Sequence, residues 1–90
     1  MEYKYLKYPA SIAALAEELS RVVDDYKGRW IGNDDLREIV EWYAQEHPEK
    51  LFSGGTYNIT MQRKLGKRRL QIIDKTLAAY KAKSPHGEEL

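Results

Sequence analysis

The chain has 90 residues and no cysteine, and charged side chains make up 32% of it. A chain of this size forms one domain with a modest core, and without cysteine it has neither disulfides nor thiolate chemistry. The net charge of +1 conceals two unlike halves, because residues 1–49 carry 6 basic and 11 acidic side chains and residues 50–90 carry 9 basic and 3 acidic. This asymmetry suggests a partner that contacts only the basic half, or acidic helices that neutralise the basic half within the domain.

The first eight residues, MEYKYLKY, are charged and aromatic, and no apolar run follows them. They do not have the pattern of a secretory signal, and no run approaches the roughly 18 apolar residues that a membrane span needs. We therefore expect a cytoplasmic protein without a membrane partner. The tyrosines of this segment predict a short extended arm that lies on the helices or pairs with the arm of a second copy.

A first helix is predicted to end near Lys27, where Gly28 stops it. Ser11 is a suitable N-cap, or Pro9 occupies the first helical position. One stripe of this helix is apolar and is expected to face the core. It consists of Ile12, Leu15, Ala16, Leu19, Val22, Val23 and Tyr26.

A second helix is predicted from Asn33, its expected N-cap, to about Glu46, before Pro48. In the loop before this helix, Trp30 and Ile31 are expected to cover one end of the core. The following segment, HPEKLFSGGTY, is the longest irregular stretch, with Leu51 and Phe52 in the core and a flexible glycine turn.

A last helix is predicted over residues 59–83, with Asn58 or Thr60 as its cap. Its apolar stripe consists of Leu70, Ile73, Leu77 and Tyr80. Gly66 either ends a first short helix or lets another backbone pack closely. The predicted fold is therefore all-α, a small bundle of three long helices with an N-terminal arm. The last helix is either continuous or split at Gly66 into a helix-turn-helix-like pair. We expect one domain over residues 1–83 and a disordered tail over residues 84–90.

The densest positive charge lies in this last helix. Between Lys50 and Ile73 there are six basic residues and no acid. Phosphate binding needs clustered cations placed by a helix, and polar side chains just before them are typical of a recognition helix. The predicted contacts with DNA or RNA are Arg63, Lys64, Lys67, Arg68, Gln62 and Asn58.

Two other roles for these cations remain open. They form a solvated face, or they pair with acids of the first two helices. Arg69 falls near the apolar stripe, so we expect it to form a structural ion pair or to bind the C-terminus of a helix.

The residues do not predict an enzyme. His47 and His86 have no acidic partner at a useful spacing, and acids that are adjacent on a helix point about 100° apart. No Cys/His or calcium-loop spacing indicates a metal site. We therefore expect no catalytic residue, no metal, no cofactor and no small-molecule substrate.

Four short motifs are distinctive: Tyr8-Pro9-x-Ser11, Asp24-Asp25-Tyr26, Leu51-Phe52 and Leu65-Gly66-Lys67-Arg68-Arg69-Leu70. Together they resemble a family of short, uncharacterised proteins of Gram-positive bacteria and their phages. The resemblance covers residues 8–80. It implies a bacterial or phage cytosolic setting and brings no activity and no site residue with it.

A second class of function is a protein–protein interaction module, either a homodimer or a phage-encoded inhibitor of a host protein. Trp42 falls at the edge of its helix's apolar stripe, and tryptophan is enriched at interface hot spots. The predicted interface residues are Trp42, Trp30, Tyr3 and Tyr5. A basic face free of acids would favour a nucleic acid as partner, and an apolar patch around Trp42 would favour a protein.

Overall fold

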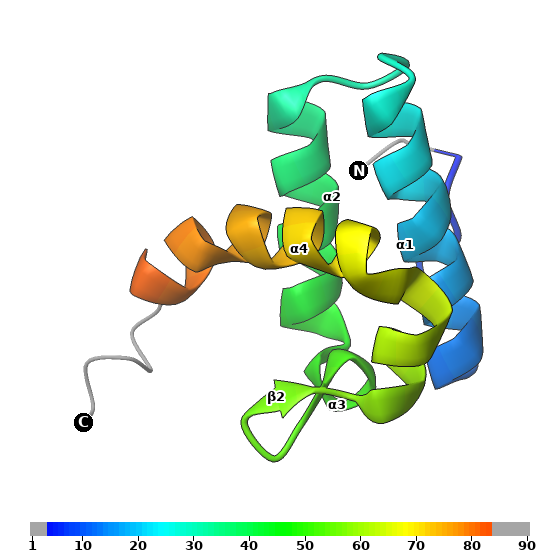
Figure 1. Ribbon diagram of the computed structural model, residues 1–90, viewed down its shortest axis with the longest axis vertical. Coiled ribbons are helices and arrows are strands. Elements are labelled where there is room, and N and C mark those ends of the chain that lie inside the picture. Colours follow the sequence, from blue (N-terminus) through cyan, green and yellow to red (C-terminus); the bar gives the residue numbers. More distant parts are fainter. Residues whose placement is uncertain (1–3, 84–90) are drawn as a thin grey trace.

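The computed structural model describes the backbone of residues 4–83 and the side chains of residues 4–78. Over this range the chain is mostly helical, with four helices and a small two-stranded sheet (Figure 1). The elements are α1 (Ile12–Lys27), α2 (Asn33–Glu46), α3 (Pro48–Leu51), β1 (Phe52–Ser53), β2 (Thr56–Tyr57) and α4 (Ile59–Lys83). The all-α prediction is therefore broadly right, and α3 and the sheet are additions to it.

Helices α1 and α2 lie side by side in opposite directions, and α4 crosses over them at a steep angle (Figure 1). Apolar side chains from all three helices meet between them and are fully buried, among them Leu15, Leu19, Val22, Ile39, Tyr43, Met61, Ile73 and Leu77. Among the described residues, no helix combines the length and hydropathy needed to cross a bilayer. Tyr3, the side chain of Tyr80 and the expected disordered tail lie outside the described residues.

Helix α1 has the boundaries that its sequence predicts. The Ser11 side chain accepts a hydrogen bond from the Ala14 N–H (3.1 Å), which satisfies one of the free donors at the helix start. The helix ends at Lys27, and Gly28 is its C-cap.

The corner between α1 and α2, which we call the α1–α2 corner, reverses the chain at a residue other than the glycine. Gly28 has a φ of −83°, and Arg29 takes the left-handed conformation with a φ of 68°. The Trp30 N–H donates to the Asp25 carbonyl (2.8 Å) and the Arg29 N–H to the Tyr26 carbonyl (3.1 Å), as in a Schellman motif. The reversal turns Trp30 outward, where it is 81% exposed. The expectation that Trp30 covers one end of the core is therefore wrong.

The start of α2 also differs from the prediction. Gly32, and not Asn33, is the N-cap, because its backbone is extended and its carbonyl accepts the Leu36 N–H (2.9 Å). The Asp35 carboxylate accepts the Gly32 N–H (3.0 Å). The Asn33 side chain instead accepts a hydrogen bond from the Tyr26 hydroxyl (2.8 Å), which ties α2 to α1. Ile31 does pack against the core, as expected.

The segment expected to be irregular is ordered by α3 and a hairpin. Strands β1 and β2 pair in an antiparallel register, with Phe52 opposite Tyr57. The two glycines between them, Gly54 and Gly55, have φ values of 60° and 86°, and two positive φ values are what a tight type I′ turn requires. Leu51 is buried and Phe52 is half-buried, so both residues pack as predicted.

Before α1, the chain forms an arm that packs on α1 and α2. The Leu6 N–H donates to the Glu18 carboxylate (3.1 Å), and the Leu6 carbonyl accepts the Tyr43 hydroxyl. The His47 ring donates through Nε2 to the Lys7 carbonyl (2.8 Å). Side chains of Glu18, Tyr43 and His47 therefore form hydrogen bonds with backbone groups of the arm. Glu18 and His47 are both buried at these contacts.

Candidate nucleic-acid interface

Helix α4 is interrupted at Gly66, whose φ of 81° and ψ of 167° are not helical. We call this point the Gly66 corner. Before it Leu65 is buried, and after it Ile73 and Leu77 are buried, so both segments pack on the core. A Cβ added at Gly66 would meet no atom within 4 Å. The backbone conformation therefore requires the glycine, as predicted for the end of a first short helix, and close packing does not.

Four cations flank the Gly66 corner and point into solvent. Arg63 and Lys64 lie before the corner, Lys67 and Arg68 lie after it, and all four are exposed. Across residues 4–78, no carboxylate forms an ion pair with any of them. These four residues, which we call the flanking cations, are therefore available to an external anion.

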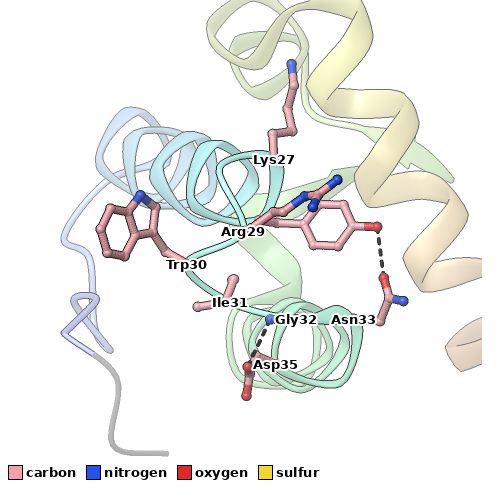
Figure 2. Close-up of a pocket in the computed structure, with 8 residues that line it drawn as sticks. Lys27, Arg29, Trp30, Ile31, Gly32, Asn33 and Asp35 are labelled. Carbon is pink, nitrogen blue, oxygen red and sulfur yellow. Dashed lines mark hydrogen bonds between the residues drawn. The ribbon is translucent and has the colours of Figure 1, made fainter.

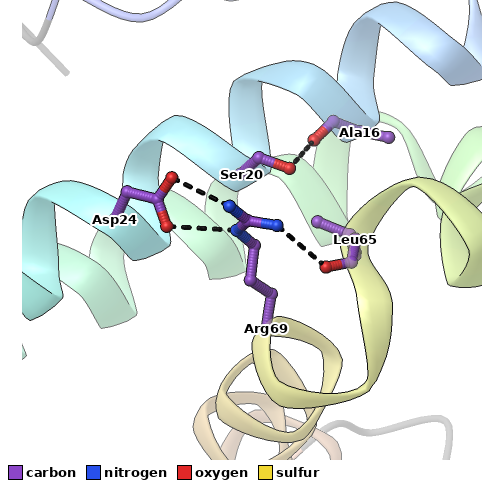
Figure 3. A network of polar contacts seen from close by, with 5 residues as sticks. All are labelled: Ala16, Ser20, Asp24, Leu65 and Arg69. Atoms are coloured by element: carbon purple, nitrogen blue, oxygen red, sulfur yellow. Dashed lines mark hydrogen bonds and ion pairs between the residues drawn. The ribbon is translucent and has the colours of Figure 1, made fainter.

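Arg69, the next residue along, has a different role. Its Nε and Nη2 donate to the two carboxylate oxygens of Asp24 on α1 (3.1 Å each), and its Nη1 donates to the Leu65 carbonyl (3.2 Å; Figure 3). The hydrogen bonds to Asp24 raise the pKa of the guanidinium above its ordinary value. Both predicted roles of Arg69, an ion pair and a contact with a helix C-terminus, are confirmed.

Tyr57 joins the two segments of α4 across the corner. Its carbonyl accepts a hydrogen bond from the Gln62 side chain (2.8 Å) in the first segment, and its hydroxyl donates to Asp74 (2.9 Å) in the second. Burial, together with the hydrogen bond to the Asp74 carboxylate, raises the pKa of the Tyr57 hydroxyl. Tyr57 and Arg69 thus hold the corner from two sides.

Two of the predicted nucleic-acid contacts are used within the chain. The Asn58 side chain accepts the Thr60 N–H (2.8 Å), so Asn58 caps α4 as expected. The Gln62 amide donates to the Tyr57 carbonyl. One end of each amide is thus engaged, so neither side chain can make the two-ended contact that reads adenine while these bonds are intact. Phosphate contact through the flanking cations is the chemistry that remains.

Of the predicted protein-interface residues, those that the structure describes have three different environments. The Tyr5 ring is buried and its hydroxyl donates to Asp25, and these two effects raise the pKa of Tyr5. Trp42 is half-buried among the rings of Tyr8, Tyr43 and His47. Trp30 is exposed in the loop before α2, and its backbone N–H donates to the Asp25 carbonyl.

An open hollow at the α1–α2 corner is a feature that the sequence did not suggest. Its volume is about 520 Å³, and Lys27, Arg29 and Trp30 contribute side chains to it (Figure 2). The sequence predicted Gly28 only as the stop of the first helix, whereas Arg29, which lines this hollow, takes the left-handed conformation. Among the described residues, no three His, Asp or Glu side chains gather in a way that could hold a metal ion.

Residues 6–78 match the model of the CLB_0814_fam family, which is described as "Conserved hypothetical protein". The match spans most of the chain, so the protein belongs to this family. It covers nearly the same range as the resemblance noted from the sequence motifs. No curated protein and no solved structure matches the chain.

Proposed function

We propose that the protein is a small non-enzymatic nucleic-acid-binding accessory protein, and that the flanking cations contact phosphate. The observation that supports the proposal is a contrast between neighbouring basic residues of α4. Arg69 is paired with Asp24, whereas Arg63, Lys64, Lys67 and Arg68 are exposed and form no ion pair with a described residue. Clustered cations of this kind supply the sequence-independent part of nucleic-acid affinity.

The Gly66 corner supports this role because it divides the cations into two pairs on two helical segments. The corner is held by Arg69, which donates to the Leu65 carbonyl before it, and by Tyr57, which contacts α4 on both sides of it. The cations therefore project from a fixed backbone. Binding then costs less conformational entropy than it would from a flexible basic tail.

The same geometry predicts weak sequence preference. Asn58 and Gln62, the polar residues placed to read bases, are engaged with backbone groups of the chain. Phosphate contacts position a protein on a nucleic acid but carry no direct sequence information. We expect affinity to depend strongly on salt and little on base composition.

The test is a titration of labelled duplex and single-stranded oligonucleotides at several salt concentrations. The K67Q/R68Q variant removes two exposed cations without removing a described contact. Its plot of log affinity against log salt should be shallower than wild type by about 1.8 on duplex DNA, which corresponds to about 0.9 per phosphate contact.

The matched control is K4Q/K7Q, which removes the same charge from the N-terminal arm. Lys4 and Lys7 are exposed, and Lys4 approaches Asp25 only at 3.9 Å, so this variant should fold and bind like wild type. If wild type fails to bind at low salt, or if both double variants lose the same slope, the proposal is wrong.

A second candidate function, a protein–protein interaction module, is favoured by a different surface. Leu6 and Tyr8 are 52% and 69% exposed, and the Tyr8 ring packs edge-on against Trp42. A second copy of the chain could cover this patch. Sedimentation should then show a dimer that the L6S/Y8S variant dissociates, and a wild-type monomer at high concentration would remove this candidate.

A further inference from the structure

The hollow at the α1–α2 corner combines an exposed aromatic ring with two cations. Lys27 and Arg29 point outward on the side of α1 that α4 crosses, and Trp30 points outward on the opposite side (Figure 2). All three side chains are exposed, and the described residues form no ion pair with Lys27 or Arg29. An anionic, planar ligand laid across the end of α1 would meet the ring and both charges.

The local sequence Gly28-Arg29-Trp30 builds this arrangement at a cost to the backbone. Arg29 occupies the left-handed region that glycine ordinarily fills, although a glycine is the preceding residue. A Cβ at Gly28 would lie 3.1 Å from Cδ1 of the Trp30 indole, so the ring rests directly on the Gly28 backbone. Moving the glycine one position along would relieve the strain of Arg29, but it would displace Trp30 and remove a cation.

The surroundings of Trp30 favour a nucleotide over a protein partner. The side chains around this hollow include the cations Lys27 and Arg29 together with Asn33 and Asp35, so its lining carries positive charge that the phosphates of a nucleotide would neutralise. Of these, Asp35 is held by the Gly32 N–H and Asn33 by the Tyr26 hydroxyl. Single-stranded nucleic-acid sites combine aromatic faces with cations, through base stacking and phosphate contact. A strand that crosses the end of α1 would meet Trp30 on one side and Lys27 and Arg29 on the other.

The hollow also lies next to the surface of the flanking cations. Lys27 is one helical turn beyond Asp24, and Asp24 is the carboxylate that holds Arg69 on α4. A strand that crosses the end of α1 past Lys27 therefore arrives at the segment of α4 that begins with Lys67 and Arg68.

We propose that this hollow binds an unpaired nucleotide of a single strand, with its base stacked on Trp30 and its phosphates at Arg29 and Lys27. The inference rests on the proposed function, since it names single-stranded nucleic acid as the class that the flanking cations also hold. Duplex DNA would use the flanking cations alone, because its bases are already stacked.

The test uses the full chain with labelled oligothymidine, oligouridine and a duplex of mixed sequence. W30A should bind the single strands about five-fold to a hundred-fold more weakly than wild type and should bind the duplex unchanged. Trp30 is exposed, so its removal leaves no cavity in the core. The two single strands distinguish a DNA ligand from an RNA ligand.

A second readout follows the indole itself. W42F leaves Trp30 as the lone tryptophan, and oligothymidine should quench its emission, whereas the emission of W30F, in which Trp42 remains, should not change. K27Q/R29Q should lower the salt slope for single strands by about 1.4, at about 0.7 per contact. Lys7→Gln is the control for the loss of an exposed cation; Lys4 is left in place because it approaches Asp25, whose carbonyl accepts the Trp30 N–H.

The outcomes separate the inference from the proposed function. If wild type binds the oligonucleotides but W30A binds single strands equally well and Trp30 emission is unchanged, the nucleotide site is wrong and the role of the flanking cations stands. Equal weakening of single-strand and duplex binding by W30A also overturns base stacking. If wild type binds no oligonucleotide at low salt, the proposed function fails, and the nucleotide site fails with it.

Discussion

The α1–α2 corner and the Gly66 corner both change the direction of the chain at a residue with a positive φ, but that residue is an arginine in the first and a glycine in the second. At the Gly66 corner a glycine occupies a conformation with φ 81° and ψ 167°, which is essentially closed to other residues. At the α1–α2 corner an arginine has a φ of 68°, while the neighbouring Gly28 keeps an ordinary φ of −83°. The Gly66 corner has an unstrained backbone, and the α1–α2 corner is strained at Arg29.

The two corners also differ in the interactions that stabilise them. The Gly66 corner is held by Arg69, which joins the Leu65 carbonyl to Asp24 of α1, and by Tyr57, which precedes α4; its exposed cations take no part in that support. The α1–α2 corner is closed by backbone hydrogen bonds from Arg29 and Trp30, whose side chains are exposed. At both corners cations are exposed to solvent: the flanking cations at the Gly66 corner, and Lys27 and Arg29 at the α1–α2 corner.

The largest expected effect comes from replacing Gly66. Gly66→Ala forces a side chain into a conformation that glycine alone adopts readily, so the free energy of unfolding should fall by about 1–3 kcal/mol. Urea denaturation measures the change. Gly32→Ser is the control for adding a Cβ, because Gly32 has an extended φ of −96°, the nearest atom to an added Cβ is 4.0 Å away, and serine is a favourable residue at this N-cap. A Gly66 variant as stable as the control would show that the corner carries no conformational requirement.

Removing the ion pair at the Gly66 corner should have a smaller effect. Arg69→Gln breaks its bonds to Asp24 and to the Leu65 carbonyl, and stability should fall by about 1 kcal/mol, because the pair is half-exposed and water screens it. A double-mutant cycle with Asp24→Asn isolates the pairwise part. Additive losses in the two single variants would mean that the pair contributes nothing to holding α4 on α1.

Relieving the strain at the α1–α2 corner should raise stability slightly. Arg29→Gly places glycine in the left-handed position, and the free energy of unfolding should increase by about 0.5–1 kcal/mol. Arg29→Ala removes the same charge but keeps the strain, so it should bring no such gain. If the alanine variant is stabilised equally, the effect belongs to the lost charge and not to the backbone.

The parts of the fold that were predicted correctly depend on signals within a few residues. The Ser11 and Asn58 caps, the end of α1 before Gly28 and the break at Gly66 each follow from the local chemistry of one side chain. The pairing of Arg69 was also foreseeable, because its place beside the apolar stripe brings it against α1.

The errors lie at the α1–α2 corner, where the conformation of the loop decides the outcome. Asn33 has the composition of an N-cap, but the Tyr26 hydroxyl binds its side chain, and Gly32 acts as the cap. Trp30 was assigned to the core because of its size, whereas a positive φ at Arg29 turned it outward. The sequence alone shows neither the Tyr26–Asn33 hydrogen bond nor the positive φ of Arg29.

In the candidate site, too, some features could be predicted from the sequence and others could not. The exposure of the flanking cations followed from helical periodicity and from the lack of acids nearby in the sequence. That Gln62 is committed to the Tyr57 carbonyl, and that Lys27 and Arg29 share a hollow with Trp30, depended on packing between elements.

The most direct measurement compares two adjacent arginines on the same duplex DNA. Arg68 is exposed and forms no ion pair with a described residue, whereas Arg69 is bound to Asp24. For Arg68→Gln, the slope of log affinity against log salt should be shallower by about 0.9, with stability unchanged. For Arg69→Gln, the slope should equal that of wild type while stability falls. Equal slope changes in the two variants, or no change in either, would contradict the claim that the cations flanking Gly66 bind phosphate.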